Sequence, residues 1–186
     1  VTGKLSDEQS QCVLQAIDRL SQSRLHIVFG SGYTSSDVRA YALQVQAAEG
    51  TKPALIVVDY MQLLKDEEGD GRMRERNVSA AARGLKDVSG ELGMPVLGLV
   101  QLNRNRATRV DKRPQLADLR ESGDLENTAD SVLGLYRDEI DHPDSNDRGL
   151  AELSVLKKRQ LGEEVGTIRR LVWVGESYRD FSYQAV

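Results

Sequence analysis

Cysteine, histidine and long apolar runs are scarce in this 186-residue sequence. Its single cysteine, Cys12, excludes a disulfide framework, and with two histidines a metal cluster of Cys and His ligands is not expected. Cys12 falls in a helix-like segment, where we expect it in the core. No apolar run approaches the roughly 20 residues that span a bilayer, and the N-terminal stretch VTGKLSDEQS lacks the apolar centre of a signal peptide. We therefore expect a cytoplasmic protein with no membrane partner.

The rest of the composition is that of an ordinary globular protein. Hydrophobic residues make up 39% of the sequence and charged residues 29%, which is typical of a single domain with a real core. The formal net charge of −4 argues against a molecule covered in basic surface. It leaves room for a local basic patch, so charge matters segment by segment.

Helices are predicted where apolar residues recur at spacings of three and four. Ser6 and Gln9 resemble a capping box at the start of a first helix, which includes Val13 to Leu20. The two further predicted helices are residues 38–49, with Ser35 or Ser36 as the cap and Gly50 at the end, and about 75–92.

Strands are predicted in short β-prone apolar runs bounded by turn residues. Three runs are apolar on both faces, which is the habit of parallel strands covered by helices. They are ALIVVD (54–59), PVLGLVQ (95–101) and SVLGLYR (131–137), while LHIVF (25–29) is a shorter β-prone run. AELSVLK and TIRRLVWV, around a turn at 162–166, indicate an antiparallel pair. Residues 103–127 show little periodicity, so we predict a long functional loop and then a short helical piece.

The acid Asp59 directly follows the first of these strands, and Gln101 ends the second. Alternating strands and helices indicate an open α/β sheet, in which ligands bind at the carboxyl ends of the strands. A carboxylate after a buried apolar run is unfavourable without a partner, and Mg²⁺ bound to phosphate is the usual partner in P-loop NTPases. Asp59 could equally cap the next turn or pair with a lysine, and the residues alone leave both interpretations open.

A set of longer motifs follows in order: LIVVDYMQLL, GMPVLGLVQLNR, DKRPQLADLRESGDLENTADSVLGLYRDE, and KKRQLG followed by GTIRRL. Together they closely resemble the C-terminal ATPase domain of DnaB-type replicative helicases, over nearly the whole chain. The resemblance implies an α/β fold with a RecA-like P-loop NTPase core, a mostly parallel sheet with helices on both faces, and a C-terminal antiparallel hairpin. It also implies ATP and Mg²⁺ as cofactors and a homo-hexamer around single-stranded DNA, with primase and a helicase loader as further partners.

The sequence departs from this family at the phosphate-binding loop. The family needs G-x-x-x-x-G-K-[ST] to hold the phosphates, and no such stretch is present. TGK at residues 2–4 is followed by Leu5 rather than Ser or Thr, and GSG at residues 30–32 has no lysine after it. We therefore expect residues 1–186 to be the C-terminal part of a single motor domain, with the P-loop segment and the N-terminal helicase domain absent.

The resemblance implies roles for three residues at the ATP site. Asp59 matches the Mg²⁺-binding aspartate at the end of the Walker B strand. Gln101 matches the polar residue that senses the γ-phosphate, and its amide can donate and accept at once. Arg137 in YRDE matches a position near the nucleotide base, where a guanidinium can stack on a π-face. From the residues alone, Gln101 is as well explained by a bond to loop backbone, and Arg137 by a surface ion pair.

Lys157 and Arg159 in LKKRQ match the pair that reaches across a subunit boundary into the neighbour's ATP site. Charge develops on the transferring γ-phosphoryl group, and cations supplied from another chain stabilise it. A solvated basic turn is the alternative for this pair.

Cations gather between residues 104 and 113, where RNRATRVDKR holds five of them and one acid. Such a cluster suits the phosphate backbone of nucleic acid. LRESG (119–123) matches the family's central-channel loop, in which a glycine lets a backbone amide approach a phosphate closely. A charged loop solvated on both sides is the alternative. The residues predicted to bind DNA are Arg104, Arg106, Arg113, Arg120, Glu121 and Gly123.

The expected function is that of a replicative DNA helicase motor, which couples ATP hydrolysis to translocation on single-stranded DNA and duplex unwinding. We expect the chain by itself to be inactive, because it has no P-loop to complement the transition state. The alternative is a non-catalytic RecA-like remnant that binds DNA or partner proteins. A strand followed by G-x-x-x-x-G-K-[ST] upstream of Val1 would favour the motor.

Overall fold

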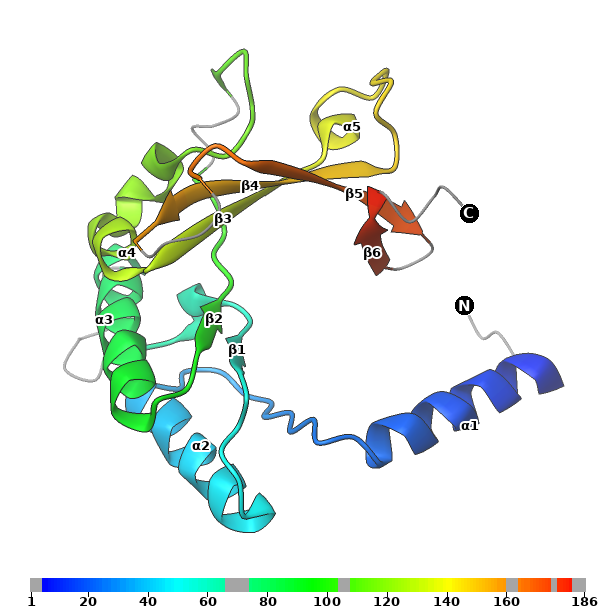
Figure 1. Cartoon of the computed structure of the whole chain (residues 1–186), viewed down its shortest axis with the longest axis vertical. Coiled ribbons are helices and arrows are strands. Elements are labelled where there is room, and N and C mark those ends of the chain that lie inside the picture. Colours follow the sequence, from blue (N-terminus) through cyan, green and yellow to red (C-terminus); the bar gives the residue numbers. More distant parts are fainter. Residues whose placement is uncertain (1–4, 66–73, 104–107, 160–163, 175–176, 182–186) are drawn as a thin grey trace. The chain divides into compact units, whose positions relative to one another are not determined.

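The computed structural model describes residues 5–65, 74–103, 108–159, 164–174 and 177–181 (Figure 1). The side chains of residues 74–76 and 120–124 are outside this description. The chain divides into two compact units, Val1–Gly30 and Ser31–Val186. No helix among the described residues is long and apolar enough to cross a membrane.

The smaller unit contains the helix α1 (Asp7–Ser21). The predicted capping box is confirmed, because Ser6 Oγ accepts from Gln9 N at 3.2 Å and Gln9 Oε1 accepts from Ser6 N at 3.0 Å. The strand predicted over residues 25–29 is wrong, since this segment has no regular secondary structure. A strand needs a neighbour for its backbone groups, and this unit has no other described strand to provide one. Cys12 is exposed rather than in the core, because the described part of this unit has no second helix or strand to cover it.

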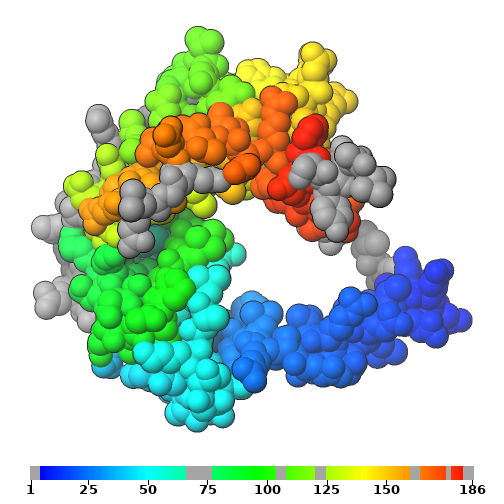
Figure 2. Space-filling model, in the orientation of Figure 1, coloured from blue at the N-terminus to red at the C-terminus, as the bar shows by residue number. Residues whose placement is uncertain are grey.

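Two helices of the larger unit, α2 (Ser35–Glu49) and α3 (Arg74–Leu92), pack against each other (Figures 1 and 2). Both were predicted, but α2 is capped by Thr34, whose hydroxyl accepts from Asp37 N at 3.3 Å, and not by either of the two serines that follow. A hydroxyl on the residue just before a helix faces the free N–H groups of its first turn. Gly50 ends α2 as predicted, in the left-handed region with a φ of 66°.

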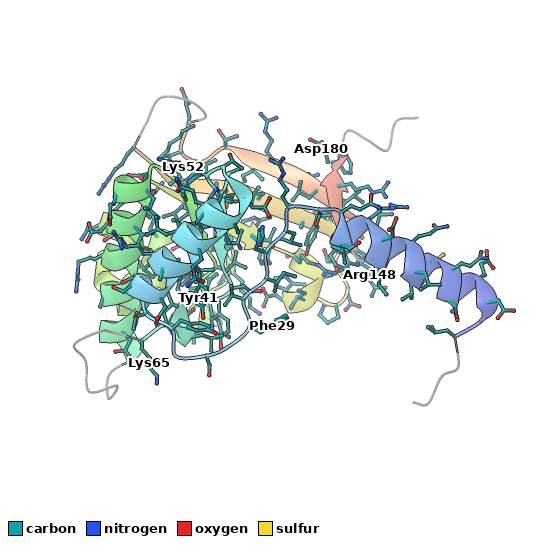
Figure 3. All side chains as sticks on the ribbon, turned by 90° about the horizontal axis from the view of Figure 1, so that it is seen from below. Phe29, Tyr41, Lys52, Lys65, Arg148 and Asp180 are labelled. Carbon is teal, nitrogen blue, oxygen red and sulfur yellow. The ribbon has the colours of Figure 1, made fainter. Side chains whose placement is uncertain are left out.

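The side chain of Ser35 at the start of α2 lies close to the backbone of Gly84 in α3. A Cβ atom added at Gly84 of α3 would lie 2.1 Å from Ser35 Oγ, so a larger residue would push the helices apart. After α2, the Lys52 ammonium donates to Leu92 O at the end of α3 at 2.8 Å (Figure 3). The start of α2 therefore contacts the middle of α3, and the segment after α2 is bonded to the end of α3.

Two short strands, β1 (Ile56–Val58) and β2 (Val96–Gly98), pair in parallel with Val58 opposite Gly98. Both were predicted, and both are shorter than predicted. After β1 the chain turns into a 3-10 helix, η1 (Met61–Leu63). β1, η1 and α3 share one hydrophobic core, whose buried members are Val58, Met61, Leu64, Val78, Ala81, Ala82, Leu85 and Leu125. This core fixes the place where the carboxyl ends of the two strands lie.

Four antiparallel strands form a second sheet, in the order β3 (Ser131–Tyr136), β4 (Leu150–Lys158), β5 (Ile168–Val174) and β6 (Ser177–Asp180). The predicted antiparallel pair is confirmed as β4 and β5, with Leu150 opposite Val172. β3 was predicted to be buried on both faces like the parallel strands, but it pairs with β4. Its Leu133 and Leu135 are exposed and Tyr136 is buried, and such one-sided burial suits an antiparallel sheet.

Helical turns precede β3 and follow it. The 3-10 helix η3 (Leu116–Ser122) and α4 (Gly123–Thr128) form the predicted short helical piece, and α5 (Asp138–Asp141) comes after β3. The predicted α/β class is confirmed, with a parallel strand pair beside helices and an antiparallel hairpin that belongs to a larger sheet.

Candidate functional site

Asp59 and Gln101 follow the paired strands β1 and β2 and line the same open pocket. Its volume is about 320 Å³, and Tyr60, Leu99 and Val100 complete its lining. Parallel strands end at the same edge of a sheet, so two residues 42 positions apart in the chain meet here. The structure places both residues at one pocket, while their roles stay predictions.

Four hydrogen bonds tie the two strand ends to each other, one of them from Gln101 N to Gln62 Oε1 at 3.5 Å. Leu99 N donates to Val58 O at 3.0 Å, and Met61 N donates to Leu99 O at 2.9 Å. Gln62 Nε2 donates to Gln101 O at 3.2 Å, which links η1 to the backbone of the predicted sensor. Sequence reasoning missed Gln62. The sequence signal for Gln62 was an amide side chain three residues after Asp59, in the turn that follows β1.

Gly98 leaves room for the turn that begins at Asp59. A Cβ atom at Gly98 would lie 2.5 Å from Met61 Sδ, and Met61 is only 4% exposed. The peptide bond between Asp59 and Tyr60 is cis. The absence of a side chain at Gly98 therefore lets the buried Met61 anchor the turn against β2.

The donors at this pocket fit a magnesium–nucleotide ligand. Mg²⁺ is usually bound by one or two carboxylates, several waters and the phosphates of the substrate. Asp59 is exposed at the pocket and provides one carboxylate. Among the described residues, no group of three His, Cys, Asp or Glu side chains could hold a metal ion without such help. A magnesium ion at this place would thus be held by Asp59 together with water and phosphate oxygens.

Lys157 and Arg159 lie at the end of β4 beside the last turn of α4. The Lys157 ammonium donates to Ala129 O at 2.9 Å and to Glu126 O, and the Arg159 guanidinium donates to Asn127 O. Carbonyl groups at the end of a helix have no intrahelical partner, so cations suit them. Burial, and then the charge of Arg159, lower the pKa of Lys157. The predicted trans pair lies together, in contact with α4 of its own chain.

Arg137 follows β3 and lies over an aromatic ring. Its guanidinium carbon is 5.3 Å from the ring centroid of Trp173. Arg137 also pairs with Glu139, and this hydrogen bond raises the pKa of Arg137. The ion pair that the residues alone suggested is present, and a role beside a nucleotide base stays a prediction.

The described cations of the basic stretch 104–113 face carboxylates of their own chain. Arg113 also lies 5.2 Å from the ring centroid of Tyr136, and its hydrogen bond with Glu152 raises the pKa of Arg113. The DNA-binding role predicted for Arg113 stays a prediction, and the contact that the structure shows is internal to the fold. The ion pairs are Arg109–Asp118, Lys112–Asp141 and Arg113–Glu152, at 2.9, 4.0 and 2.6 Å.

The other residues predicted to bind DNA are only partly described. Arg104 and Arg106 lie outside the described residues, and so do the side chains of Arg120 and Glu121. The backbone of Arg120 and Glu121 is placed in η3, and Gly123 is the first residue of α4. The predicted DNA loop therefore runs directly into the helix whose end contacts the predicted trans cations.

A polar network around Tyr136 was not predicted. Its hydroxyl donates to Asp138 Oδ1 at 2.7 Å, and His142 Nδ1 lies 2.9 Å from the same oxygen. Burial raises the pKa of Tyr136 to about 12. Hydrogen bonds from Ser145, Tyr136 and His142 lower the pKa of Asp138. Tyr136 and Asp138 of the YRDE motif therefore help to hold the end of β3 against the turn that follows it.

The comparisons with known proteins all point to the same family. The model of the DnaB-like helicase C terminal domain matches residues 1–181. The chain is 36% identical over 168 residues to the replicative DNA helicase DnaB of Geobacillus stearothermophilus, covering 90% of the chain and 36% of that protein. It is 40% identical over 169 residues to the replicative DNA helicase DnaB of Buchnera aphidicola subsp. Schizaphis graminum, covering 90% of the chain and 35% of that protein. The chain thus spans little more than a third of the length of these relatives.

Solved structures agree with this. A structure described as an ATPase domain superposes with a TM-score of 0.86 at 29% identity, over 96% of this chain and 62% of the other. A DnaB-like replicative helicase, described with its interactions with primase, superposes with a TM-score of 0.82 at 30% identity. That match covers 92% of this chain and 41% of the helicase. Both similarities extend over nearly all of the chain.

Proposed function

Because this chain belongs to the DnaB-like helicase C-terminal domain family, we propose that residues 1–186 are the C-terminal part of one RecA-like motor domain. The family match spans both compact units, which supports one domain rather than two. In a polypeptide with an intact phosphate-binding loop, this domain couples ATP hydrolysis to movement along single-stranded DNA and to duplex unwinding. The chain alone does not hydrolyse ATP, because the sequence has no G-x-x-x-x-G-K-[ST] stretch.

The meeting of Asp59 and Gln101 in one pocket carries this proposal. The Asp59 carboxylate would be one of the ligands of a magnesium ion, and the Gln101 amide would face the phosphate end of the nucleotide. Bound magnesium supplies positive charge that neutralises the phosphate oxygens during transfer. Gln62 donates a hydrogen bond to the backbone of Gln101, so the turn that begins at Asp59 helps to fix the position of Gln101 at the pocket.

The trans cations and the DNA loop complete the motor in a homo-hexamer. Lys157 and Arg159 act on the nucleotide of the next subunit, while Arg137 lies near the base of the bound nucleotide. The segment from Arg120 to Gly123, which is helical in the structure, and the basic stretch 104–113 face single-stranded DNA. A primase is a further partner by analogy with the related helicase whose interactions with primase are described. A helicase loader is a further partner that the resemblance to DnaB-type helicases implies.

Subunit mixing tests the trans assignment. In a polypeptide that carries an intact phosphate-binding loop ahead of this chain, Arg159→Ala should remove ring ATPase while nucleotide binding is retained, because its target is the transition state on the neighbour. Lys157→Ala should behave similarly. Rings that mix Arg159→Ala subunits with subunits lacking the P-loop lysine should regain activity at mixed interfaces. Arg169→Ala, in the exposed part of β5, is the matched control and should keep normal turnover.

Two outcomes would contradict parts of this proposal. Normal turnover in Arg159→Ala rings, or a loss of turnover that no mixing ratio restores, would remove the trans role. A wild-type polypeptide with an intact phosphate-binding loop that assembles and binds DNA, yet shows no ATP turnover, would favour the remnant.

A further inference from the structure

Asp130 joins three elements at the base of the predicted trans cations. It lies between α4 and β3, and its carboxylate forms an ion pair with Lys86 of α3. Its backbone oxygen accepts from Arg159 N at 2.8 Å, and its Oδ1 lies 3.8 Å from Arg159 Nη1. The Lys86 hydrogen bond lowers the pKa of Asp130, so the carboxylate is charged at neutral pH. A single charged residue thus connects α3 to the guanidinium at the end of β4.

The Arg159 side chain contacts its own chain and remains partly exposed to solvent. Arg159 Nη2 donates to Asn127 O, Asp130 Oδ1 lies 3.8 Å from Nη1, and the side chain is 49% exposed. The five donors of a guanidinium lie in one fixed plane, so contacts at one edge set the direction of the others. The backbone bond to Asp130 fixes the Cα atom from which the side chain extends.

We propose that Asp130 is the positioning residue of Arg159, and that it orients the guanidinium toward the nucleotide of the neighbouring subunit. This inference rests on the proposed trans role of Arg159. A cation stabilises developing charge best when it needs no reorganisation during the reaction, and a free arginine side chain has many rotamers to lose. In this proposal Asp130 contacts no nucleotide itself and acts through Arg159.

Lys86 supports this position through the other side of the carboxylate. Its ammonium pairs with Asp130 Oδ2, while Oδ1 faces Arg159. Asp130 therefore does not have to turn away from α3 to contact the guanidinium. Because α3 carries much of the core, this pair ties the position of Arg159 to the packed interior of the larger unit.

A double-mutant cycle tests the proposal in an assembled ring that carries an intact phosphate-binding loop. The variants are Asp130→Asn, Arg159→Ala and the double variant, followed by hydrolysis of labelled ATP so that residual turnover is measurable. Asp130→Asn should lower kcat about fivefold at unchanged KM, since half-exposed charge contacts are modest. The same substitution should cause no further loss in the Arg159→Ala background. Asp87→Asn, at the exposed neighbour of Lys86 on α3, is the matched control and should leave kcat unchanged.

Mixing distinguishes positioning from a general structural effect. Asp130→Asn subunits that receive Arg159 from P-loop-deficient subunits with intact Asp130 should hydrolyse ATP at the wild-type rate per competent site. Unchanged kcat in Asp130→Asn, or an equal fold loss in both backgrounds, would overturn the proposal. Normal turnover in Arg159→Ala would instead overturn the trans role itself. Melting temperature and ring size, measured for each variant, show whether a loss of kcat comes from unfolding or from disassembly.

Discussion

The substitution Gly98→Ala tests whether the turn after β1 is packed as the structure shows. The added Cβ would lie 2.5 Å from Met61 Sδ and 3.1 Å from Met61 Cγ, both closer than ordinary contact. Met61 is buried, so its side chain has to shift within the core or push η1 away from β2. Overpacking of this kind costs about 1–3 kcal/mol of unfolding free energy. For a chain of this size, a loss of ~2 kcal/mol lowers Tm by roughly 4–8 °C.

The matched control is Gly90→Ala in α3, where an added Cβ has no atom within 4 Å. Glycine inside a helix is less favourable than alanine, so Gly90→Ala should raise the unfolding free energy by about 0.5–1 kcal/mol. Thermal unfolding followed by circular dichroism measures both variants against wild type. A Tm for Gly98→Ala that equals or exceeds that of wild type would refute the packing of Met61 against β2. An equal loss in Gly90→Ala would show that the assay does not report this contact.

Three further predictions concern pH, the Arg113 contact and DNA. The pKa of Tyr136 is raised from 10.0 to about 12 in the folded chain, so its contribution to stability is complete below pH 10 and is lost as pH rises toward 12. Tyr136→Phe should remove this alkaline dependence in urea unfolding measured across pH, and an unchanged dependence would refute the prediction. Arg113→Lys should destabilise the fold by about 1 kcal/mol, because lysine cannot form the paired contact with Glu152, whereas exposed Arg179→Lys should have no effect in the same unfolding assay. In assembled rings, Arg120→Ala should flatten the slope of log single-strand affinity against log salt by about 0.7 per lost phosphate contact. Gly123→Val should weaken binding without loss of charge. Slopes and affinities equal to those of wild type would show that this segment does not contact DNA.

Local patterns predicted the helices and most strands because they depend on residues close in the chain. The Ser6–Gln9 capping box and the end of α2 at Gly50 are decided within a few residues, and both were found as predicted. The partner of β3 depends instead on long-range pairing. Apolar composition alone did not show that Leu133 and Leu135 face away from the core. The run 25–29 failed for the same reason, since β-prone residues form a strand only beside another strand.

The candidate site was predictable where the rule that ligands bind at the carboxyl ends of strands is enough to place a residue. Asp59 and Gln101 were each expected at the carboxyl end of a strand, where ligands bind, and they line one pocket. The contacts of Gln62 and Asp130 depend on turns whose geometry no periodicity describes. Charge counting also failed to show that Arg109 and Arg113 face carboxylates of their own chain. Their partners lie 9 and 39 positions further along the sequence, which is beyond the reach of local pairing rules.

Strand displacement on a forked DNA duplex tests the central claim most directly. The protein is an assembled polypeptide that carries an intact phosphate-binding loop ahead of this chain, as wild type and as Asp59→Asn, with exposed Asp87→Asn as the control. The account predicts ATP- and magnesium-dependent unwinding by wild type and by the control. It predicts that Asp59→Asn rings still bind single-stranded DNA but no longer unwind the duplex. Unwinding by Asp59→Asn at the wild-type rate, or wild-type rings that bind DNA and ATP without unwinding, would contradict it.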